Sequence, residues 1–336
     1  HHVILLTTAG FGDLLEIRRQ KRPDLYDLFV QAPRLLISRN RRYEVMERID
    51  ADGAVVQALD EAALQALLDR FDVAPDAVAV CCLFSFLNPT HEQAIRRLLT
   101  ERFPDAYVSL SCEVAPEFRE YERLSTTAVN AYLGPVMQRY LANFARRVAE
   151  AGIGCTPYIA QSNGGILSVR QAMETPVRTL ASGPSAGVIG ALHTARDAGF
   201  QDLLTFDMGG TSTDVCLIKE GRPLITVGRT VADQPLRVPM MDVHSIGAGG
   251  GSIAWTDAAG ALWVGPQSAG AHPGPAAYGE GGSRPTVTDA NVVLGRLNPQ
   301  ALLDGALPIR QELARRAVEA DVARPLGLPV EEAAAG

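Results

Sequence analysis

The sequence contains almost no lysine. Its 336 residues include only Lys21 and Lys219, and the other basic residues are arginines. A lysine nucleophile or a phosphate-binding lysine is therefore not expected to be central. The formal net charge is −7 at pH 7, whereas a surface that binds nucleic acid favours a basic stripe. This acidic balance argues against nucleic acid as a partner.

Long apolar runs are also missing. The longest candidate, residues 77–87, is shorter than the roughly 18 residues that a membrane helix needs, so no membrane association is expected. The cysteines are odd in number and lack metal-ligand spacing. They are Cys81, Cys82, Cys112, Cys155 and Cys216. Each lies in or beside an apolar segment, so we expect reduced core thiols of a cytoplasmic protein.

Segments with strand-like spacing of apolar residues alternate along the chain with segments of helical spacing. Residues 78–87 have strand character, and residues 60–71 and 125–151 have helical spacing. Such alternation predicts the α/β class with a mainly parallel or mixed sheet. The length favours two domains. Helices dominate before residue 180 and glycine-rich hairpins follow it, so the domains are expected to be 1–180 and 181–336.

Residues 203–218 predict a hairpin whose turn carries hydroxyl side chains between two carboxylates. The turn region contains Asp207, Gly209, Gly210, Thr211, Ser212, Thr213 and Asp214. Glycines allow backbone N–H groups to face a ligand. A carboxylate beside phosphate would repel it, unless the carboxylate holds Mg²⁺. The pattern therefore predicts a phosphate-binding hairpin, and the alternative is a purely structural turn.

The hairpin segment 204–215, LTFDMGGTSTDV, resembles the second phosphate motif of the hydantoinase A/5-oxoprolinase family. That family belongs to the class of actin-like ATPases. Further segments similar to the family are residues 5–20, 22–27, 162–165, 182–187, 245–252, 273–278 and 288–291. The resemblance implies an actin-like (RNase H-like) ATPase fold with two domains around a cleft. Residues 1–180 would be the remainder of the first domain, and 181–336 the second.

The resemblance also implies ATP-dependent ring opening of a cyclic amide such as hydantoin or 5-oxoproline, with phosphoryl activation of the amide. Asp207 and Asp214 would be catalytic and hold Mg²⁺. The groups that contact ATP would be Gly209, Gly210, Thr211, Ser212, Thr213, Gly247, Gly249 and Gly250. Two alternatives stay open, namely a subunit of an ATP-dependent ketone carboxylase and a non-catalytic scaffold for a B-type subunit. The expected protein partner is a B-type subunit or domain, and a homo-oligomer is possible.

Two family motifs are not found in the sequence. One is an earlier phosphate hairpin, and the other is a late glycine-rich adenosine motif. The chain is therefore expected to be a fragment truncated at both ends. By itself it is expected neither to hydrolyse ATP nor to bind it tightly.

Several other polar residues allow more than one interpretation. Asp242 and His244 alternate along a strand and would share a face, either as metal ligands or as a structural contact. His272 lies in the glycine- and proline-rich loop 265–282 and would contact substrate or a partner. The Ser245–Ser252 region could approach a ligand as bare backbone, or form a tight turn against a neighbouring strand.

Four more features are expected to have mainly structural roles. His91 follows a helix start and is expected in its capping region. Asp289 and Asn291 would cap a helix or line the cleft. Residues 182–187 open a helix and would either bind an anion or allow close packing. The mixed-charge run 119–123 is expected on a surface or at a subunit contact.

Overall fold

The structure, a computed structural model, describes residues 2–20, 24–30, 35–300 and 308–336. The chain divides into two compact units. Unit 1 contains residues 1–186 and 225–241, and unit 2 contains residues 187–224 and 242–336. Lys21, Arg22 and Pro23, which belong to segments noted above, lie outside the described residues.

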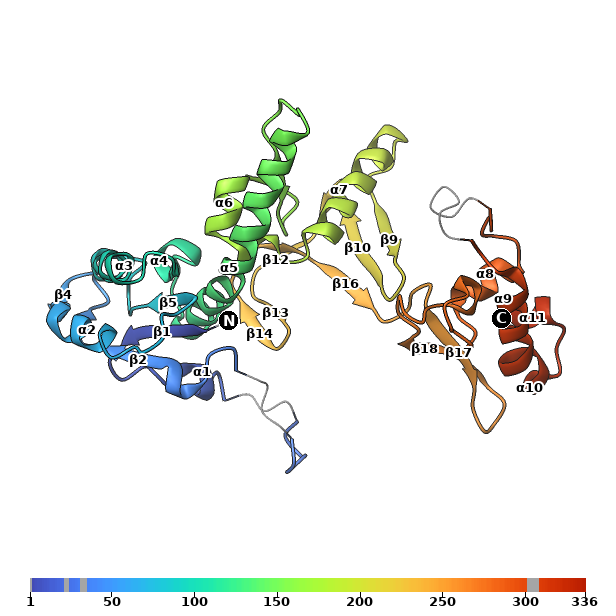
Figure 1. Cartoon of the computed structure of the whole chain (residues 1–336), viewed down its shortest axis with the longest axis horizontal. Coiled ribbons are helices and arrows are strands. Elements are labelled where there is room, and N and C mark those ends of the chain that lie inside the picture. The colour runs from blue at the N-terminus through green and yellow to red at the C-terminus, as the bar shows by residue number, and fades with distance from the viewer. Residues whose placement is uncertain (1, 21–23, 31–34, 301–307) are drawn as a thin grey trace. The chain divides into compact units, whose positions relative to one another are not determined.

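Unit 1 is built on a parallel four-stranded sheet with the order β2-β1-β5-β6 (Figure 1). The strands are β1 (Val3–Thr8), β2 (Arg42–Val45), β5 (Ala77–Cys81) and β6 (Tyr107–Leu110). Every residue of the central strands β1 and β5 is buried. Strands covered on both faces are nearly continuous apolar runs, as these two are. The predicted α/β class is confirmed.

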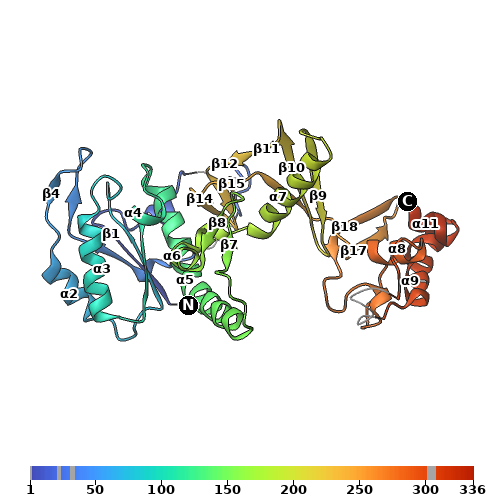
Figure 2. The ribbon, with the colours of Figure 1, turned by 90° about the horizontal axis from the view of Figure 1, so that it is seen from above.

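Helices cover both faces of this sheet (Figures 1 and 2). Helices α2 (Glu61–Leu68) and α3 (Thr90–Arg102) pack on the face that includes Ile4 and Leu6. Helices α1 (Leu14–Ile17) and α5 (Glu120–Glu150) pack on the opposite face. Because side chains alternate along a strand, consecutive residues of β1 contribute to two separate cores.

The other elements of unit 1 are short. They are η1 (Arg39–Arg41), β3 (Arg48–Ile49), β4 (Val55–Gln57), α4 (Ser111–Val114), β7 (Tyr158–Ala160), β8 (Ile166–Ser168), α6 (Val169–Glu174), η2 (Pro176–Thr179), β12 (Ile225–Thr226), β13 (Arg229–Val231), β14 (Gln234–Leu236) and β15 (Met240–Met241). Strands β13 and β14 form a hairpin that contacts α5. None of the described helices is both long and apolar enough to cross a membrane.

Unit 2 contains an antiparallel sheet in which β10 (Thr213–Lys219) pairs with β9 (Leu203–Met208), β11 (Arg222–Pro223) and β16 (Val243–Ile246). Helix α7 (Ser182–Asp197) begins in unit 1 and continues into unit 2. The rest of unit 2 is a hairpin followed by a helical cluster. Its elements are β17 (Ser252–Thr256), β18 (Leu262–Ser268), η3 (Ala276–Tyr278), α8 (Val287–Val293), α9 (Gln311–Val318), η5 (Glu319–Ala323), α10 (Arg324–Leu326) and α11 (Val330–Ala335).

The strand predicted over residues 78–87 is wrong beyond Cys81. The Cys82 N–H donates to Glu92 Oε1 at 2.8 Å instead of continuing the ladder. Phe84 then adopts a left-handed conformation with φ of 52°. The Arg123 guanidinium holds this turn by donating to the Cys82 carbonyl at 2.7 Å and to Ser85 Oγ at 3.1 Å.

Two further expectations need correction. The run 119–123 is not a surface segment throughout, because Arg123 is only 1% exposed and Tyr121 is buried as well. These residues begin α5, whose first turns pack against the sheet of unit 1. All five cysteines are free thiols, but Cys155 is exposed rather than in the core.

Candidate functional site

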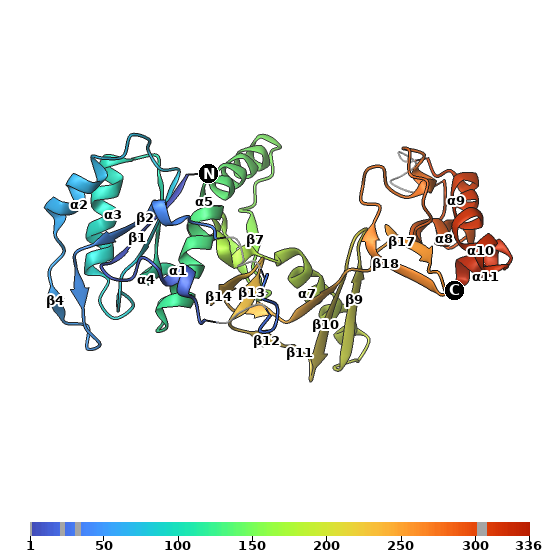
Figure 3. The ribbon, with the colours of Figure 1, turned by 90° about the horizontal axis from the view of Figure 1, so that it is seen from below.

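The predicted hairpin forms at the end of two antiparallel strands of unit 2 (Figure 3). Strand register places Asp207 of β9 opposite Asp214 of β10. The turn between them is closed by a hydrogen bond from the Gly209 N–H to the Ser212 carbonyl at 2.9 Å. The two carboxylates therefore lie at the turn end of the sheet, close to the glycines that separate them in sequence.

Three polar residues form a row across this end of the sheet. Asp214 pairs with Asp207 on one side and with Ser245 of β16 on the other. The Ser245 hydroxyl donates to Asp214 Oδ1. Helix α7 lies on the same side, since a Cβ atom on Gly187 would be 3.5 Å from Asp207 Oδ2. Like charges directly opposite on paired strands are destabilising, so a bound cation would stabilise this row.

The turn itself presents unused donors. Among the described residues, no hydrogen bond is formed by the backbone N–H groups of Gly210, Thr211 and Ser212, or by the hydroxyl groups of Thr211 and Ser212. Gly209, Gly210 and Thr211 are exposed, and a Cβ atom on Gly210 would have no neighbour within 4 Å. An open cluster of backbone and hydroxyl donors is the chemistry that binds an anion.

A glycine-rich loop supports the turn from behind. The Gly250 N–H donates to the Gly209 carbonyl at 2.9 Å, and the Gly251 N–H donates to the Gly210 carbonyl at 2.6 Å. In a planar trans peptide the C=O and the following N–H point in opposite directions. Holding these two carbonyls therefore turns the N–H groups of Gly210 and Thr211 away from the loop.

The contact between loop and turn requires a glycine at position 249. A Cβ atom there would lie 2.6 Å from Thr211 C and 2.7 Å from Thr211 N. The loop is anchored on its other side by Thr288, whose N–H and Oγ1 donate to the Gly250 carbonyl at 2.7 and 2.8 Å. Gly249 and Gly250 thus shape the turn, whereas Gly247 has open space around it.

The predicted hydroxyl residues differ in their surroundings. Thr213 is only 2% exposed, and its hydroxyl donates to the Ala248 carbonyl at 2.5 Å. It therefore joins the hairpin to the glycine-rich loop. The hydroxyls of Thr211 and Ser212 form no such hydrogen bond among the described residues. Direct ligand contact by any of these residues stays a prediction.

Other candidate residues form pairs rather than clusters. His244 Nε2 lies 3.5 Å from Asp242 Oδ2, and His272 Nδ1 lies 3.1 Å from Glu280 Oε2. Both histidines are exposed on the surface. Within the described ranges, no group of three or more His, Cys, Asp or Glu side chains is placed to hold a metal ion.

Asp289 has a structural environment. It is fully buried, and it accepts hydrogen bonds from the Ala276 and Ala277 N–H groups at 3.2 and 2.7 Å. It also forms a capping box with Thr286 at the start of α8. Burial raises the pKa of its carboxyl group, although these donors act in the opposite direction. The expected capping role fits this geometry.

Unit 1 contains a buried polar contact that sequence reasoning missed. Glu47, 1% exposed, accepts a hydrogen bond from the Thr8 hydroxyl, and its Oε2 lies 2.7 Å from His91 Nδ1. His91 thus lies in the first turn of α3 as expected, but it is buried against Glu47 rather than acting as a cap. The 44 residues between the partners leave no local sequence signal.

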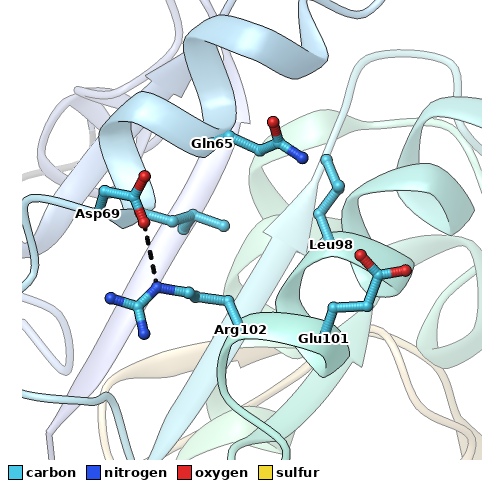
Figure 4. Close-up of a pocket in the computed structure, with 6 residues that line it drawn as sticks. Gln65, Asp69, Leu98, Glu101 and Arg102 are labelled. Atoms are coloured by element: carbon cyan, nitrogen blue, oxygen red, sulfur yellow. Dashed lines mark hydrogen bonds and ion pairs between the residues drawn. The ribbon is translucent and has the colours of Figure 1, made fainter.

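A small cavity lies between α2 and α3 of unit 1 (Figure 4). It has a volume of about 230 Å³, and an ion pair between Asp69 Oδ1 and Arg102 Nε at 3.2 Å crosses it. Gln65, Leu98 and Glu101 complete most of its lining. This lining contains no histidine, thiol or hydroxyl, so it offers little catalytic chemistry.

The site can now be compared with known proteins. Residues 123–336 match the model of the Hydantoinase/oxoprolinase family, and residues 1–103 match that of the Hydantoinase/oxoprolinase N-terminal region. The chain belongs to the hydantoinase/oxoprolinase family. The resemblance inferred from the hairpin and its companion segments is thereby confirmed.

Individual members of the hydantoinase/oxoprolinase family align over almost the entire chain. The caprolactamase alpha subunit of Pseudomonas jessenii is 42% identical, over 99% of this chain and 48% of that protein. The acetophenone carboxylase gamma subunit of Aromatoleum aromaticum is 37% identical, over 98% and 47%. The crystal structure of the ATP-dependent caprolactamase from Pseudomonas jessenii superimposes with a TM-score of 0.81, at 42% identity, over 100% of this chain and 49% of that one. The chain thus spans about half the length of these relatives.

Proposed function

We propose that this chain supplies the phosphate-binding hairpin of an ATP-dependent enzyme that opens a cyclic amide. The observation that carries the proposal is the turn 209–212, where free N–H and hydroxyl donors lie beside the opposed carboxylates of Asp207 and Asp214. Membership of the hydantoinase/oxoprolinase family supports ATP as the ligand. The chemistry of phosphoryl transfer depends mainly on positioning and charge stabilisation, which such a hairpin offers.

Each part of the hairpin has a proposed role. The N–H groups of Gly210 and Thr211 donate to phosphate oxygens, and the hydroxyls of Thr211 and Ser212 add further donors. Gly209 closes the turn through its bond to Ser212, and Thr213 joins the hairpin to the glycine-rich loop. Gly249 and Gly250 form the wall behind the turn, and Gly247 has the open surroundings that a direct ligand contact needs.

The donor set fits Mg²⁺ bound together with phosphate. Mg²⁺ is commonly held by one or two carboxylates, with phosphate oxygens and water completing its shell. Asp207 is exposed, and Asp214 is fixed by Ser245, so one carboxylate is free to move while the other is oriented. When bound, Mg²⁺ would neutralise the negative charge that these carboxylates and the phosphates share.

A cyclic amide is the first proposed substrate class. The caprolactamase relative is named for the opening of a lactam, and the family name includes hydantoinase and oxoprolinase. ATP supplies the phosphoryl group that makes a stable amide carbon electrophilic enough for water to attack. Within this chain, Asp214 and Asp207 would hold the Mg²⁺ that accompanies the transferring end of the nucleotide.

Ketone carboxylation is the second candidate, because the acetophenone carboxylase gamma subunit is 37% identical over 98% of the chain. Turnover of ATP by the full-length protein separates the two classes. Stimulation by caprolactam, hydantoin or 5-oxoproline supports the first class, and stimulation by acetone or acetophenone with bicarbonate supports the second. The relatives are named as subunits, which supports a B-type partner, and ATP turnover without that partner would contradict a purely scaffolding role.

The role of the hairpin is tested by Asp207→Asn in the full-length protein. Loss of charge at this position is expected to reduce ATP turnover by about 100-fold or more, as for other groups that stabilise transition-state charge. The matched control is Asp197→Asn, at the exposed end of α7 in the same unit. Unchanged turnover in Asp207→Asn, or an equal decrease in the control, would remove Asp207 from the mechanism.

A further inference from the structure

Unit 1 contains a cavity that the hairpin chemistry does not use. It has a volume of about 400 Å³ and is lined by residues from three separate segments of the unit. Arg18 and Arg19 follow α1, residues 119–122 begin α5, and residues 227–237 include the β13–β14 hairpin. Figure 3 shows α1 and the β13–β14 hairpin beside α5, and both contact that helix.

The lining of this cavity is rich in positive charge. Four guanidinium groups line it, those of Arg18, Arg19, Arg119 and Arg237, against the carboxylates of Glu122 and Asp233. The whole chain has a net charge of −7, so this local excess of arginine is opposite in sign to the protein as a whole. A concentration of positive charge in a concave surface raises the local concentration of anions.

Two of these arginines form ion pairs with carboxylates of the protein itself. Arg19 donates to Glu122 through Nε at 2.9 Å and through Nη2 at 2.5 Å. Arg237 donates to Glu117 through Nε at 3.0 Å and through Nη2 at 2.6 Å. Both are two-pronged contacts, the geometry in which guanidinium matches a planar carboxylate best. These pairs hold the walls in position.

Arg119 differs from its neighbours. Within the described ranges, no carboxylate lies within ion-pair distance of its guanidinium, which instead lies 5.5 Å from the centre of the Phe118 ring. Its backbone is left-handed, with φ of 76°, a conformation that is costly for a residue with a long side chain. Arg119 also precedes the first turn of the 31-residue helix α5, where the helix dipole favours an anion.

The walls of the cavity are firmly packed. The Arg237 N–H donates to Thr126 Oγ1 of α5 at 2.9 Å. Leu236 and Val238 on either side are buried in a core with Val129 of α5. Tyr121 is 7% exposed, and burial raises the pKa of its phenol, so the hydroxyl stays a neutral donor. These contacts hold the β13–β14 hairpin against α5 on this side of the cavity.

We infer that this cavity binds a small molecule that carries a carboxylate group, with Arg119 as the principal ligand-binding residue. The site would accept the carboxylate of a substrate or of an effector, and all the residues that line it belong to unit 1. A volume of about 400 Å³ lies within the usual range of small-molecule sites.

The test uses calorimetry on the chain with three sodium salts at equal ionic strength, namely succinate, phosphate and chloride. Succinate is expected to bind, and Arg119→Asn is expected to weaken that binding by about 10-fold or more, because a charge-assisted contact is lost. Asparagine tolerates the left-handed backbone. Arg170→Asn, at a highly exposed arginine of α6, is the matched control and is expected to leave binding unchanged.

A second variant keeps the inference testable if Arg119→Asn fails to fold. Asp233→Asn removes one lining carboxylate at a left-handed position of the β13–β14 turn and should strengthen succinate binding by about 3-fold through reduced repulsion. Three results would overturn the inference. They are no heat beyond that of chloride, equal weakening in Arg170→Asn, and Arg119-dependent binding of phosphate without succinate. None of these readouts involves ATP.

Discussion

Asp207 and Asp214 lie directly opposite each other on neighbouring antiparallel strands, at the end of the sheet where the glycine turn begins. Opposed carboxylates repel each other, and here the repulsion occurs beside a turn in which the N–H groups of Gly210, Thr211 and Ser212 have no acceptor among the described residues. Both features are unfavourable in isolation. Each becomes favourable when a cation binds to the carboxylates and an anion binds to the turn.

Because Asp207 and Asp214 oppose each other, Mg²⁺ should stabilise the folded chain. Asp207→Asn is expected to raise the stability of the metal-free chain by about 0.2–1 kcal/mol, because a repulsive cross-strand pair is removed. MgCl₂ should raise the unfolding temperature of the original chain but not that of the variant, when NaCl is matched for ionic strength. Thermal unfolding followed by circular dichroism measures this difference, and an equal Mg²⁺ response in both proteins would contradict a cation site at this pair.

The stability of the chain should be far more sensitive to substitution of Gly249 than of Gly247 in the glycine-rich loop. Gly249→Ala places a Cβ atom 2.6 Å from the backbone of Thr211, and overpacking of this kind costs about 1–3 kcal/mol or more. Gly247→Ala meets no atom within 4 Å and should change stability by less than about 0.5 kcal/mol. Urea unfolding of the two variants provides the comparison, and equal stabilities would mean that the loop does not support the turn as described.

Burial of Arg123 should be important for the stability of unit 1. Its side chain holds the turn after β5 and lies 5.2 Å from the centre of the Phe86 ring. Arg123→Met removes the donors to the Cys82 carbonyl and to Ser85 Oγ from a residue that is 1% exposed, and leaving a buried polar group without its partner typically costs about 1–3 kcal/mol. The matched control, Arg139→Met, changes an exposed arginine of the same helix. Urea unfolding should separate the two variants, and a small cost at both positions would contradict the assigned role.

The free cysteines should react in a defined order. Cys155 is exposed, whereas Cys81 is buried and burial raises its pKa to about 11. At pH 8 iodoacetamide should modify Cys155 at least about 100-fold faster than Cys81, because only thiolate reacts and access is also required. A raised thiol pKa means that the thiolate fraction of Cys81 increases only as the pH approaches about 11. Mass spectrometry of peptides at successive times measures the order, and early modification of Cys81 would contradict the packing of β5.

Local sequence patterns predicted the parts of the protein whose determinants lie close together in the chain. The strands β9 and β10, their turn and the flanking carboxylates all fall within seventeen residues, so the local sequence pattern alone was enough to predict the hairpin. The capping role of Asp289 follows from its place three residues after Thr286.

Features that depend on distant residues were not predictable in this way. The contact of Glu47 with His91 joins residues 44 positions apart. Arg123 reaches back 41 positions to the Cys82 carbonyl, and its mixed-charge neighbours favoured an exposed segment instead. The support that Gly250 and Gly251 give to Gly209 and Gly210 likewise spans about forty residues, and no local spacing indicates it.

The most direct test of the central claim is an NMR titration of the ¹⁵N-labelled chain with MgADP up to millimolar concentration. We expect saturable shifts of the Gly210, Thr211 and Ser212 amide signals, because these N–H groups are the proposed phosphate donors. The same signals should remain unchanged with adenosine, and MgCl₂ alone should not reproduce the shifts that MgADP causes. Amide shifts confined to other regions, or none at all in this turn at saturating nucleotide, would contradict the assignment of the hairpin as a phosphate site.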